Sequence, residues 1–280
     1  MDHVLKKYCP RIEFDSYEDF AENFRIEVPE AFNFGFDVVD EWARVEPDKR
    51  ALLWCNDAGE ERAFTFTDIK HLSNQAANAF ADMGIGKGDV VMCILRRRWE
   101  YWVCAVALCK LGATIIPASL QLTRKDVVYR ANSADVRAIV AVNDDYVCTQ
   151  VEQAMPDCPT VREKFIVDGS REGWVDFDDL IAGFPDTFER PTGEAAVTSK
   201  DIMLMYFTSG TTGNPKAVEH NFAHPLGHII TAKYWQQVRE DKLHMSVTDS
   251  GWAKFGWGKI FGQWICGATI FAYDMDKFVP

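Results

Sequence analysis

Residues 203–216 read MLMYFTSGTTGNPK, an apolar strand that runs into a loop with two glycines, four hydroxyl side chains and one lysine. Glycine allows the backbone to turn its N–H groups toward an anion, and hydroxyl groups add further donors. The lysine brings a mobile positive charge. This combination predicts a loop that holds a polyphosphate, with candidate contacts from Thr208, Ser209, Gly210, Thr211, Thr212, Gly213 and Lys216.

The loop does not match the common nucleotide-binding pattern G-x-x-x-x-G-K-[ST]. Gly210 and Gly213 lie three residues apart, and Lys216 does not directly follow a glycine. Hydroxyl-rich turns are also frequent on protein surfaces. Composition alone therefore leaves two interpretations open, a polyphosphate cradle and an ordinary surface loop.

Around this loop, apolar runs alternate with segments of helical period. Strands are expected at 51–54 and 63–67, as a hairpin, and at 90–95, 113–116, 136–142 and 165–167. Helices are expected from a cap at Thr67 to Gly84, at 100–111, from a cap at Thr123 and at 144–155. Beyond residue 200, strands are expected at 202–207, 216–219, 243–247 and 268–273, with helices near 223–238 and 252–266. Continuous apolar strands that alternate with helices predict an α/β fold whose largely parallel sheet is covered on both faces.

The polar, turn-rich segment 185–200 is the best candidate for a linker. It predicts a first α/β subdomain over residues 1–190, with an extended lead-in to about Glu30. Residues 200–280 would then hold the phosphate loop and the start of a second α/β subdomain.

Composition and charge exclude several classes of protein. The 280 residues are 48% hydrophobic and carry a formal net charge of -12, which is typical of a folded acidic chain. No basic run exceeds Arg96–Arg98, so nucleic-acid binding is not expected. The longest apolar run, Trp102–Cys109, is too short to insert stably in a membrane, and the N-terminus lacks an apolar targeting core. These features predict a cytoplasmic chain, and its eight cysteines without a C-x-x-C pair predict neither disulfides nor structural zinc.

Several strings resemble the adenylate-forming superfamily, which includes acyl-CoA synthetases, luciferases and the adenylation domains of peptide synthetases. The string Tyr206–Lys216 resembles the phosphate-loop signature of that superfamily, while Phe64–Ile69 and Cys109–Pro117 resemble two of its earlier motifs. The runs Ala217–Asn221 and Thr248–Trp252 resemble the medium-chain acyl-CoA synthetase branch. Many relatives have glycine where this chain has Ala217, and alanine there fits the same branch.

The resemblance implies a fold like the first part of the large N-terminal domain of these enzymes, with layered parallel and mixed sheets flanked by helices. It implies that ATP and a carboxylic acid give an acyl-adenylate, from which coenzyme A displaces AMP to form a thioester. Lys216 would screen the β- and γ-phosphates, and Mg²⁺ would complete the charge balance. The region after Thr248 would wall the acyl pocket, with candidate lining residues Trp252, Lys254 and Trp257.

The resemblance covers only about the first half of the family's length, so we expect an N-terminal fragment without the C-terminal domain and its catalytic lysine. No catalytic residue and no metal ligand is assigned, and the chain alone is expected to be inactive. Two alternatives stay open: a non-catalytic nucleotide-binding fragment or pseudoenzyme, and an adenylation domain that serves a carrier protein. A homo-oligomer is also left open.

Other clusters carry weaker predictions. Gly84–Asp89 follows a helix and precedes a strand, which favours a tight turn over an anion site. His220, His224 and His228 lie four apart, but Pro225 interrupts or starts their helix and no carboxylate is suitably spaced, so metal ligation is disfavoured. The resemblance implies that His220 is a structural partner near the site. Arg96–Arg98 is expected to be a solvated cap, and Phe261 and Trp264 are expected to face the core.

Overall fold

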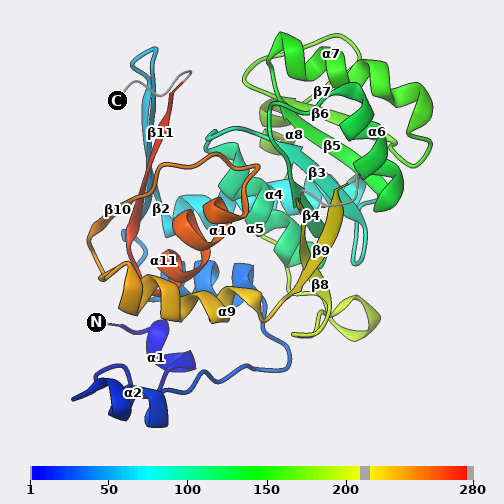
Figure 1. The fold of residues 1–280 in the computed structure, drawn as a ribbon. Coiled ribbons are helices and arrows are strands. Elements are labelled where there is room, and N and C mark those ends of the chain that lie inside the picture. The colour runs from blue at the N-terminus through cyan, green and yellow to red at the C-terminus, as the bar shows by residue number, and fades with distance from the viewer. Residues whose placement is uncertain (1, 209–214, 276–280) are drawn as a thin grey trace.

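The computed structural model describes residues 2–208 and 215–275, and it shows an α/β fold built on two sheets (Figure 1). The seven-stranded sheet has the order β7-β6-β5-β3-β4-β8-β9, and every neighbouring pair is parallel except β8 and β9. Its strands are β3 (Val90–Ile94), β4 (Thr114–Pro117), β5 (Val136–Val142), β6 (Glu163–Val167), β7 (Val175–Asp176), β8 (Ile202–Thr208) and β9 (Lys216–Asn221). The α/β prediction is confirmed.

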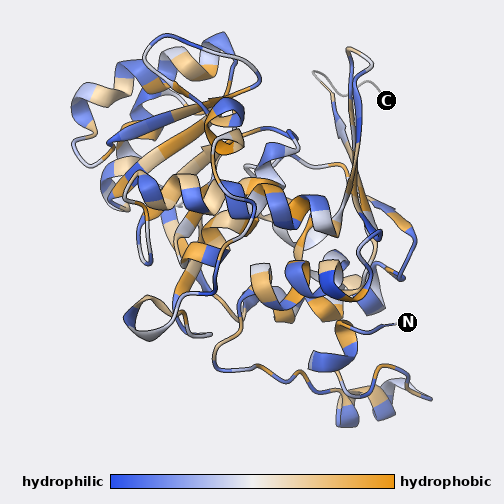
Figure 2. Cartoon of the chain, turned by 180° about the vertical axis from the view of Figure 1, so that it is seen from behind, coloured by the Kyte–Doolittle hydropathy of each residue, from blue (hydrophilic) through white to orange (hydrophobic). Residues whose placement is uncertain are grey.

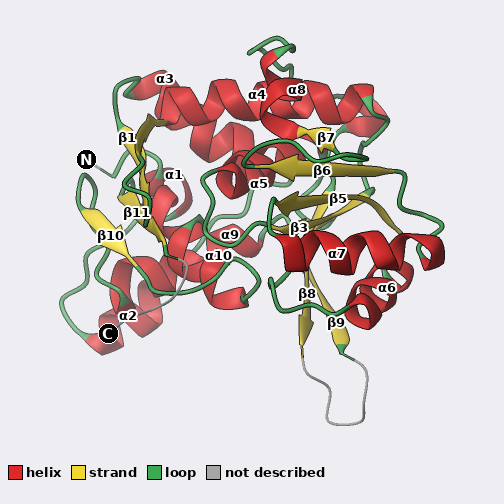
Figure 3. Ribbon diagram, turned by 90° about the horizontal axis from the view of Figure 1, so that it is seen from above, coloured by secondary structure: helices red, strands yellow, loops and turns green. Residues whose placement is uncertain are grey.

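Helices cover both faces of the seven-stranded sheet. The helices α6 (Arg124–Ser133) and α7 (Asp145–Ala154) place Val127, Ala131 and Val151 in a core on one face. The helices α4 (Phe66–Asp82), α5 (Glu100–Leu111) and α8 (Phe177–Ala182) pack on the other face (Figure 3). The outer helices carry both hydrophilic and hydrophobic residues (Figure 2), as expected when one side of a helix faces solvent.

The four-stranded sheet has the order β10-β11-β1-β2. It consists of β1 (Arg50–Asn56), β2 (Glu61–Thr65), β10 (Leu243–Met245) and β11 (Thr269–Asp274), and only β2 runs antiparallel to its neighbour. Both sheets therefore combine strands from before and after the segment 185–200. Because that segment does not separate the two sheets, the division into 1–190 and 200–280 stays a prediction about folding units.

A large apolar core lies where α5 meets the last two described helices, α10 (Ala253–Lys259) and α11 (Phe261–Ile265). Three buried tryptophans satisfy their indole N–H groups with backbone carbonyls. Trp42 donates to the carbonyl of Trp264 at 2.7 Å, and Trp264 donates to Ala51 at 3.0 Å. Trp102 donates to the carbonyl of Lys259, also at 3.0 Å. The prediction that Phe261 and Trp264 face the core is confirmed, since both side chains are buried.

Two helix boundaries differ in how well local patterns predict them. The helix α4 begins after Thr65, whose side chain and that of Asp68 cap each other's backbone N–H groups. The expected cap Thr67 is wrong, because its hydroxyl donates instead to the carbonyl of Pro47 at 2.7 Å. The expected helix at 100–111 is confirmed, and Gly112 ends it with a φ of 77°, which favours glycine.

Three segments consist of several short elements where one continuous element was expected. The lead-in holds two short helices, α1 (Leu5–Tyr8) and α2 (Tyr17–Asn23), and is followed by a π-helical turn at Gly35–Val39 and by α3 (Asp40–Val45). The expected helix at 223–238 is α9 (His224–Ile229) followed by a π-helical segment at Ile230–Trp235. The expected helix at 252–266 divides at Ile260, whose φ of −145° is not helical.

Candidate active site

The phosphate-loop candidate begins at the end of β8 and ends at the start of β9, and the structure describes both of these ends. Thr208 is the last residue of β8 and pairs in register with Lys216, the first residue of β9. The Thr208 hydroxyl lies 3.5 Å from the carbonyl oxygen of Lys216, and both side chains are exposed. The other candidate contacts lie outside the described residues, and these are Ser209, Gly210, Thr211, Thr212 and Gly213.

This pair of ends lies at the edge of the sheet where α/β proteins bind ligands. The strands β3, β4 and β8 are parallel, so their carboxyl ends share one edge of the sheet. Arg96, Ser119 and Thr208 stand at or just beyond those three ends. In open α/β sheets, ligands bind in the crevice outside the carboxyl ends of the strands. The position of Thr208 and Lys216 is therefore suitable for contacts with a ligand.

The loop that follows β10 packs directly against this edge. A Cβ placed on Gly251 would lie 2.5 Å from the Cα of Ser119 and 2.6 Å from the carbonyl carbon of Ala118. The neighbouring Ser250 is buried, and its backbone N–H donates to the carbonyl of Arg96 at 3.2 Å. The string 248–252 is thus attached to the ends of both β3 and β4.

The arginine triplet supports this attachment and is not a solvated cap, so that expectation is wrong. Arg96 pairs with the buried carboxylate of Asp274 in β11 at 2.7 Å, and Arg97 lies 3.7 Å from Asp249. Arg98 is 5% exposed and forms a bidentate pair with Glu100, with distances of 2.7 and 3.1 Å. Burial raises the pKa of Glu100 to about 7, although Arg98 opposes this shift. Each arginine has a carboxylate partner on a neighbouring segment, which explains why the triplet can be withdrawn from solvent.

The strand β8 and the helix α10 meet where the backbone of Gly256 approaches the side chain of Tyr206. A Cβ on Gly256 would lie 2.6 Å from the hydroxyl oxygen of Tyr206, so only glycine fits without a shift of the ring. Tyr206 is buried, and burial raises its pKa. The strand that ends in Thr208 is therefore packed against the helix that carries the acyl-pocket candidates.

The three acyl-pocket candidates occupy different environments. Trp252 is 63% exposed and immediately precedes α10, and Lys254 in the first turn is also exposed. Trp257 is half-buried, and its ring centroid lies 5.6 Å from that of Trp235. Within the described residues, Trp257 has no ring contact with Trp252. The structure thus pairs Trp257 with a tryptophan that sequence reasoning missed, because Trp235 stood in a segment expected to be one regular helix.

Three histidines lie in a row beside Tyr206. The ring of His220 is 5.7 Å from the Tyr206 ring and 4.2 Å from the His224 ring, between centroids. The Nε2 atoms of His224 and His228 are 3.0 Å apart, so one ring donates a hydrogen bond to the other. Burial lowers the pKa of His224 to about 3 and that of His228 to about 4. Both rings are neutral near pH 7, which fits a packed structural role.

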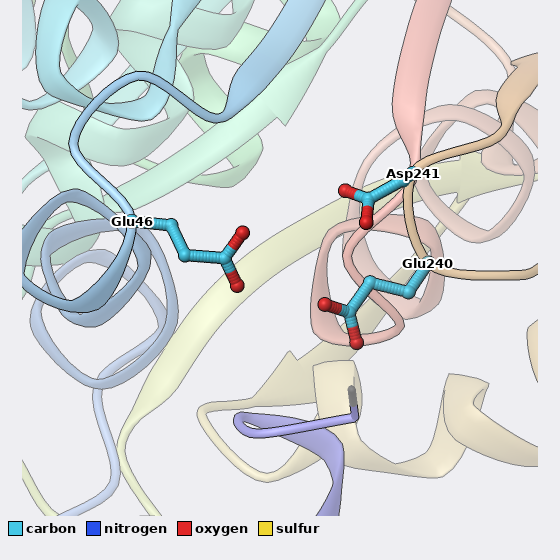
Figure 4. Close-up of side chains that lie close together, drawn as sticks. All are labelled: Glu46, Glu240 and Asp241. Carbon is cyan, nitrogen blue, oxygen red and sulfur yellow. The ribbon is translucent and has the colours of Figure 1, made fainter.

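An acidic cluster of Glu46, Glu240 and Asp241 lies elsewhere (Figure 4). The carboxylates of Glu46, Glu240 and Asp241 approach within 4.8 Å of one another, the only group of three such side chains found in the described residues. The ammonium of Lys49 lies 3.3 Å from both Glu46 and Glu240 and also pairs with Asp241. Since the ammonium of Lys49 already contacts all three carboxylates, the cluster is assigned no metal.

The family described as AMP-binding enzyme matches residues 39–279. The chain belongs to this AMP-binding family. The resemblance noted in the loop string and its flanking motifs is therefore confirmed.

Among curated relatives, the chain is 33% identical over 277 residues to the mitochondrial acyl-coenzyme A synthetase ACSM3 of Homo sapiens, covering 95% of this chain and 46% of that protein. It is 36% identical over 259 residues to the mitochondrial acyl-coenzyme A synthetase ACSM5 of Mus musculus, covering 89% and 43%. The chain thus spans about half the length of the curated relatives it matches. This AMP-binding chain is similar to acyl-CoA synthetases of the medium-chain branch that the sequence predicted.

Two solved structures share the fold. The anthranilate CoA ligase AuaEII, in complex with anthranoyl-AMP, matches with a TM-score of 0.77 and 22% identity, covering 88% of this chain and 46% of that one. The acetoacetyl-CoA synthetase from Streptomyces lividans matches with the same TM-score and 19% identity, covering 87% and 38%. The expected fold, that of the N-terminal part of adenylate-forming enzymes, is confirmed. Among the described residues of this AMP-binding chain, no helix is both long enough and apolar enough to cross a membrane.

Proposed function

We propose that this chain supplies the phosphate-binding end and the acyl-binding wall of an acyl-CoA synthetase. In this reaction a carboxylic acid and ATP form an acyl-adenylate and pyrophosphate, and coenzyme A then displaces AMP to give a thioester. The observation that carries the proposal is the placement of Thr208 and Lys216 at the carboxyl edge of the parallel strands. The contact between Tyr206 and Gly256 supports it, because it sets the acyl-pocket helix against the same strand.

The chemistry asks mainly for positioning and charge neutralisation. A carboxylate oxygen attacks the α-phosphorus of ATP, and the bond from that phosphorus to the bridging oxygen breaks, which releases pyrophosphate. Two anions must approach each other, so cations and N–H donors aimed at the phosphates lower the barrier. Lys216 and Thr208 are proposed for this task together with Ser209, Gly210, Thr211, Thr212 and Gly213. The Mg²⁺ that accompanies ATP would neutralise phosphate charge, and no residue of the chain is assigned to it.

The acyl group is proposed to lie along α10. Trp257 and its partner Trp235, whose ring planes are inclined by 44°, offer an apolar surface, and Trp252 offers a further, exposed ring. Lys254 lies in the first turn of the same helix with its side chain exposed, where its ammonium can meet a carboxylate of the substrate. This arrangement supports a carboxylic acid with an apolar tail as the substrate class.

The complete reaction is proposed for a whole protein of the relatives' length, in which this chain is the N-terminal part. The basis is coverage, since the match extends over 46% of the ACSM3 relative but 95% of this chain. Residues 1–280 alone are then expected to hold ATP no better than about millimolar, or about 4 kcal/mol of binding. Cytoplasmic location stays a prediction, and the curated relatives named above are mitochondrial by name.

The test is acid-dependent release of pyrophosphate from ATP, measured on the whole protein and on residues 1–280. We expect release with the whole protein only, at one equivalent per thioester formed, and none when the acid is omitted. ATP binding without acid-dependent release would favour the non-catalytic alternative. Transfer of the acyl group to a carrier-bound thiol, with no transfer to free coenzyme A, would favour the adenylation domain that serves a carrier protein.

A further inference from the structure

The side chain of Lys216 is exposed, and its backbone has a neighbouring strand on one side only. It begins β9, which is the edge strand of the seven-stranded sheet, and residues 216–219 are all exposed. An edge strand has no neighbouring strand on its outer side. A binding site needs its charged groups held within about 0.5 Å of the productive geometry by supporting contacts. The support for Lys216 must therefore come partly from outside the strand pair.

The helix α6 provides such a contact immediately before Lys216. The hydroxyl of Tyr129 donates a hydrogen bond to the carbonyl oxygen of Pro215 at 2.9 Å. A proline has no backbone N–H, so this carbonyl is the only backbone group through which residue 215 can be hydrogen-bonded. The bond is partly buried, which favours it over a bond to water.

The same helix also contacts the residue immediately before Thr208. The ring of Tyr129 meets the ring of Phe207 edge to face, with centroids 6.2 Å apart. The guanidinium carbon of the adjacent Arg130 lies 5.2 Å from the centroid of the Phe207 ring. The carboxylate of Asp126, one turn earlier in α6, interacts electrostatically with this guanidinium, so Tyr129 and Arg130 both act here as packing partners of Phe207.

The helix α6 is itself fixed by a cap and by buried side chains, so its contacts can hold Lys216 and Thr208 in place. Thr123 and Asp126 cap its first turn reciprocally, with the Asp126 carboxylate accepting from the Thr123 backbone N–H at 3.0 Å. Val127 and Ala131, one turn apart on its inner side, are fully buried against the sheet. Tyr129 therefore projects from a fixed helix toward the end of β8 and the start of β9.

We propose that Tyr129 is a positioning residue for ATP, which holds Lys216 and Thr208 in place through Pro215 and Phe207. This inference rests on the proposed function of Lys216. It assigns Tyr129 no contact with the substrate. Loss of its hydroxyl should therefore weaken ATP binding while the acid site on α10 is unaffected.

The test compares Tyr129→Phe, which keeps the ring and removes only the hydroxyl, with Tyr146→Phe on α7 as a control, where the tyrosine is 48% exposed. In the whole protein we expect Tyr129→Phe to raise the dissociation constant of MgATP and the KM for ATP about fivefold, which is about 1 kcal/mol. The KM for the acid, kcat and the melting temperature should stay close to those of the unmodified protein. The control should change none of these values.

Every other outcome supports or contradicts the positioning role of Tyr129 or the proposed function. A lower melting temperature and a lower kcat at unchanged KM for ATP would mean that Tyr129 only stabilises the fold. Unchanged ATP binding would overturn the proposal outright. If the unmodified protein binds MgATP without any acid-dependent reaction, the proposed function fails, and weaker ATP binding by Tyr129→Phe still supports the positioning role. If the unmodified protein binds no MgATP at all, both proposals fall.

Discussion

Gly251 and Ser119 lie so close that any side chain at position 251 would collide with the backbone after β4, since a Cβ there would be 2.5 Å from the Cα of Ser119. The two residues are 132 positions apart in the chain (251 minus 119). Their contact fixes the string 248–252 to the carboxyl edge of the parallel strands. It therefore connects the start of α10 to the edge that carries Thr208.

Replacement of Gly251 by alanine should disturb this contact. The obstructing atoms belong to backbone, which cannot move aside as a flexible side chain would, so we expect a loss of about 1–3 kcal/mol in the free energy of unfolding. Urea unfolding followed by tryptophan fluorescence measures it. Gly227→Ala is the matched control, because nothing lies within 4 Å of a Cβ at that helical position. The control should be neutral or slightly stabilising, and equal losses in both variants would contradict the proposed contact.

Replacement of Lys216 by alanine should lower the rate of acid activation in the whole protein. The change removes a positive charge proposed to lie near the phosphates, and we expect a loss of about tenfold or more in acid-dependent pyrophosphate release, at least about 1.4 kcal/mol in the barrier. Lys200→Ala removes an exposed lysine just before β8 and serves as the control. Similar rates for Lys216→Ala and the control would remove Lys216 from the mechanism.

Truncation of either member of the tryptophan pair should change the preference for acid length more than the affinity for ATP. Trp257→Ala or Trp235→Ala enlarges the proposed apolar pocket. One methylene of the acid in such a pocket is worth about 1–3 kcal/mol of discrimination between acids. Because the two rings touch, the double variant should show less than the sum of the single effects. Specificity constants for a series of straight-chain acids measure this, with Tyr17→Ala on α2 as an exposed aromatic control. A fall in melting temperature at constant acid preference would mean that the pair only stabilises the fold.

The elements that local patterns specify were predictable from the sequence. The helix at 100–111 has a continuous apolar run and a glycine at its end, and the cap Thr123 is followed three residues later by Asp126. The misplaced cap of α4 has the same cause, because Thr65 and Thr67 both precede the helix and only Thr65 has an acidic residue at the spacing that a reciprocal cap requires.

The features that tertiary contacts create were not predictable. The pairing of Trp235 with Trp257 depends on how the π-helical segment crosses α10, and no periodicity in either segment indicates it. The withdrawal of Arg98 from solvent depends on Glu100 and on Asp168, whose side chain lies 3.2 Å away although the residue is far along the chain. The hydrogen bond from Tyr129 to Pro215 likewise joins a helix to a strand end that sequence spacing does not connect.

Two neutral histidines should make the stability of the fold depend on pH. Burial holds the pKa of His224 at about 3 and that of His228 at about 4 in the folded state, and unfolding returns both to about 6.5. Below pH 6.5 the unfolded chain therefore binds more protons than the folded chain. The stabilising contribution of the pair is fully present above pH 6.5 and is lost as the pH falls toward 4, at up to about 1.4 kcal/mol per pH unit for each ring.

The comparison of His224→Gln with the unmodified chain tests this linkage, because glutamine keeps a hydrogen-bonding group and does not titrate. Between pH 7 and pH 5 the variant should lose about 1–2 kcal/mol less free energy of unfolding than the unmodified chain, since one proton-binding site of the unfolded state is gone. His71→Gln is the control, because the side chain of His71 is 48% exposed. An identical pH dependence in His224→Gln and the unmodified chain would mean that unfolding does not change the pKa of His224, which would contradict its burial as a neutral ring.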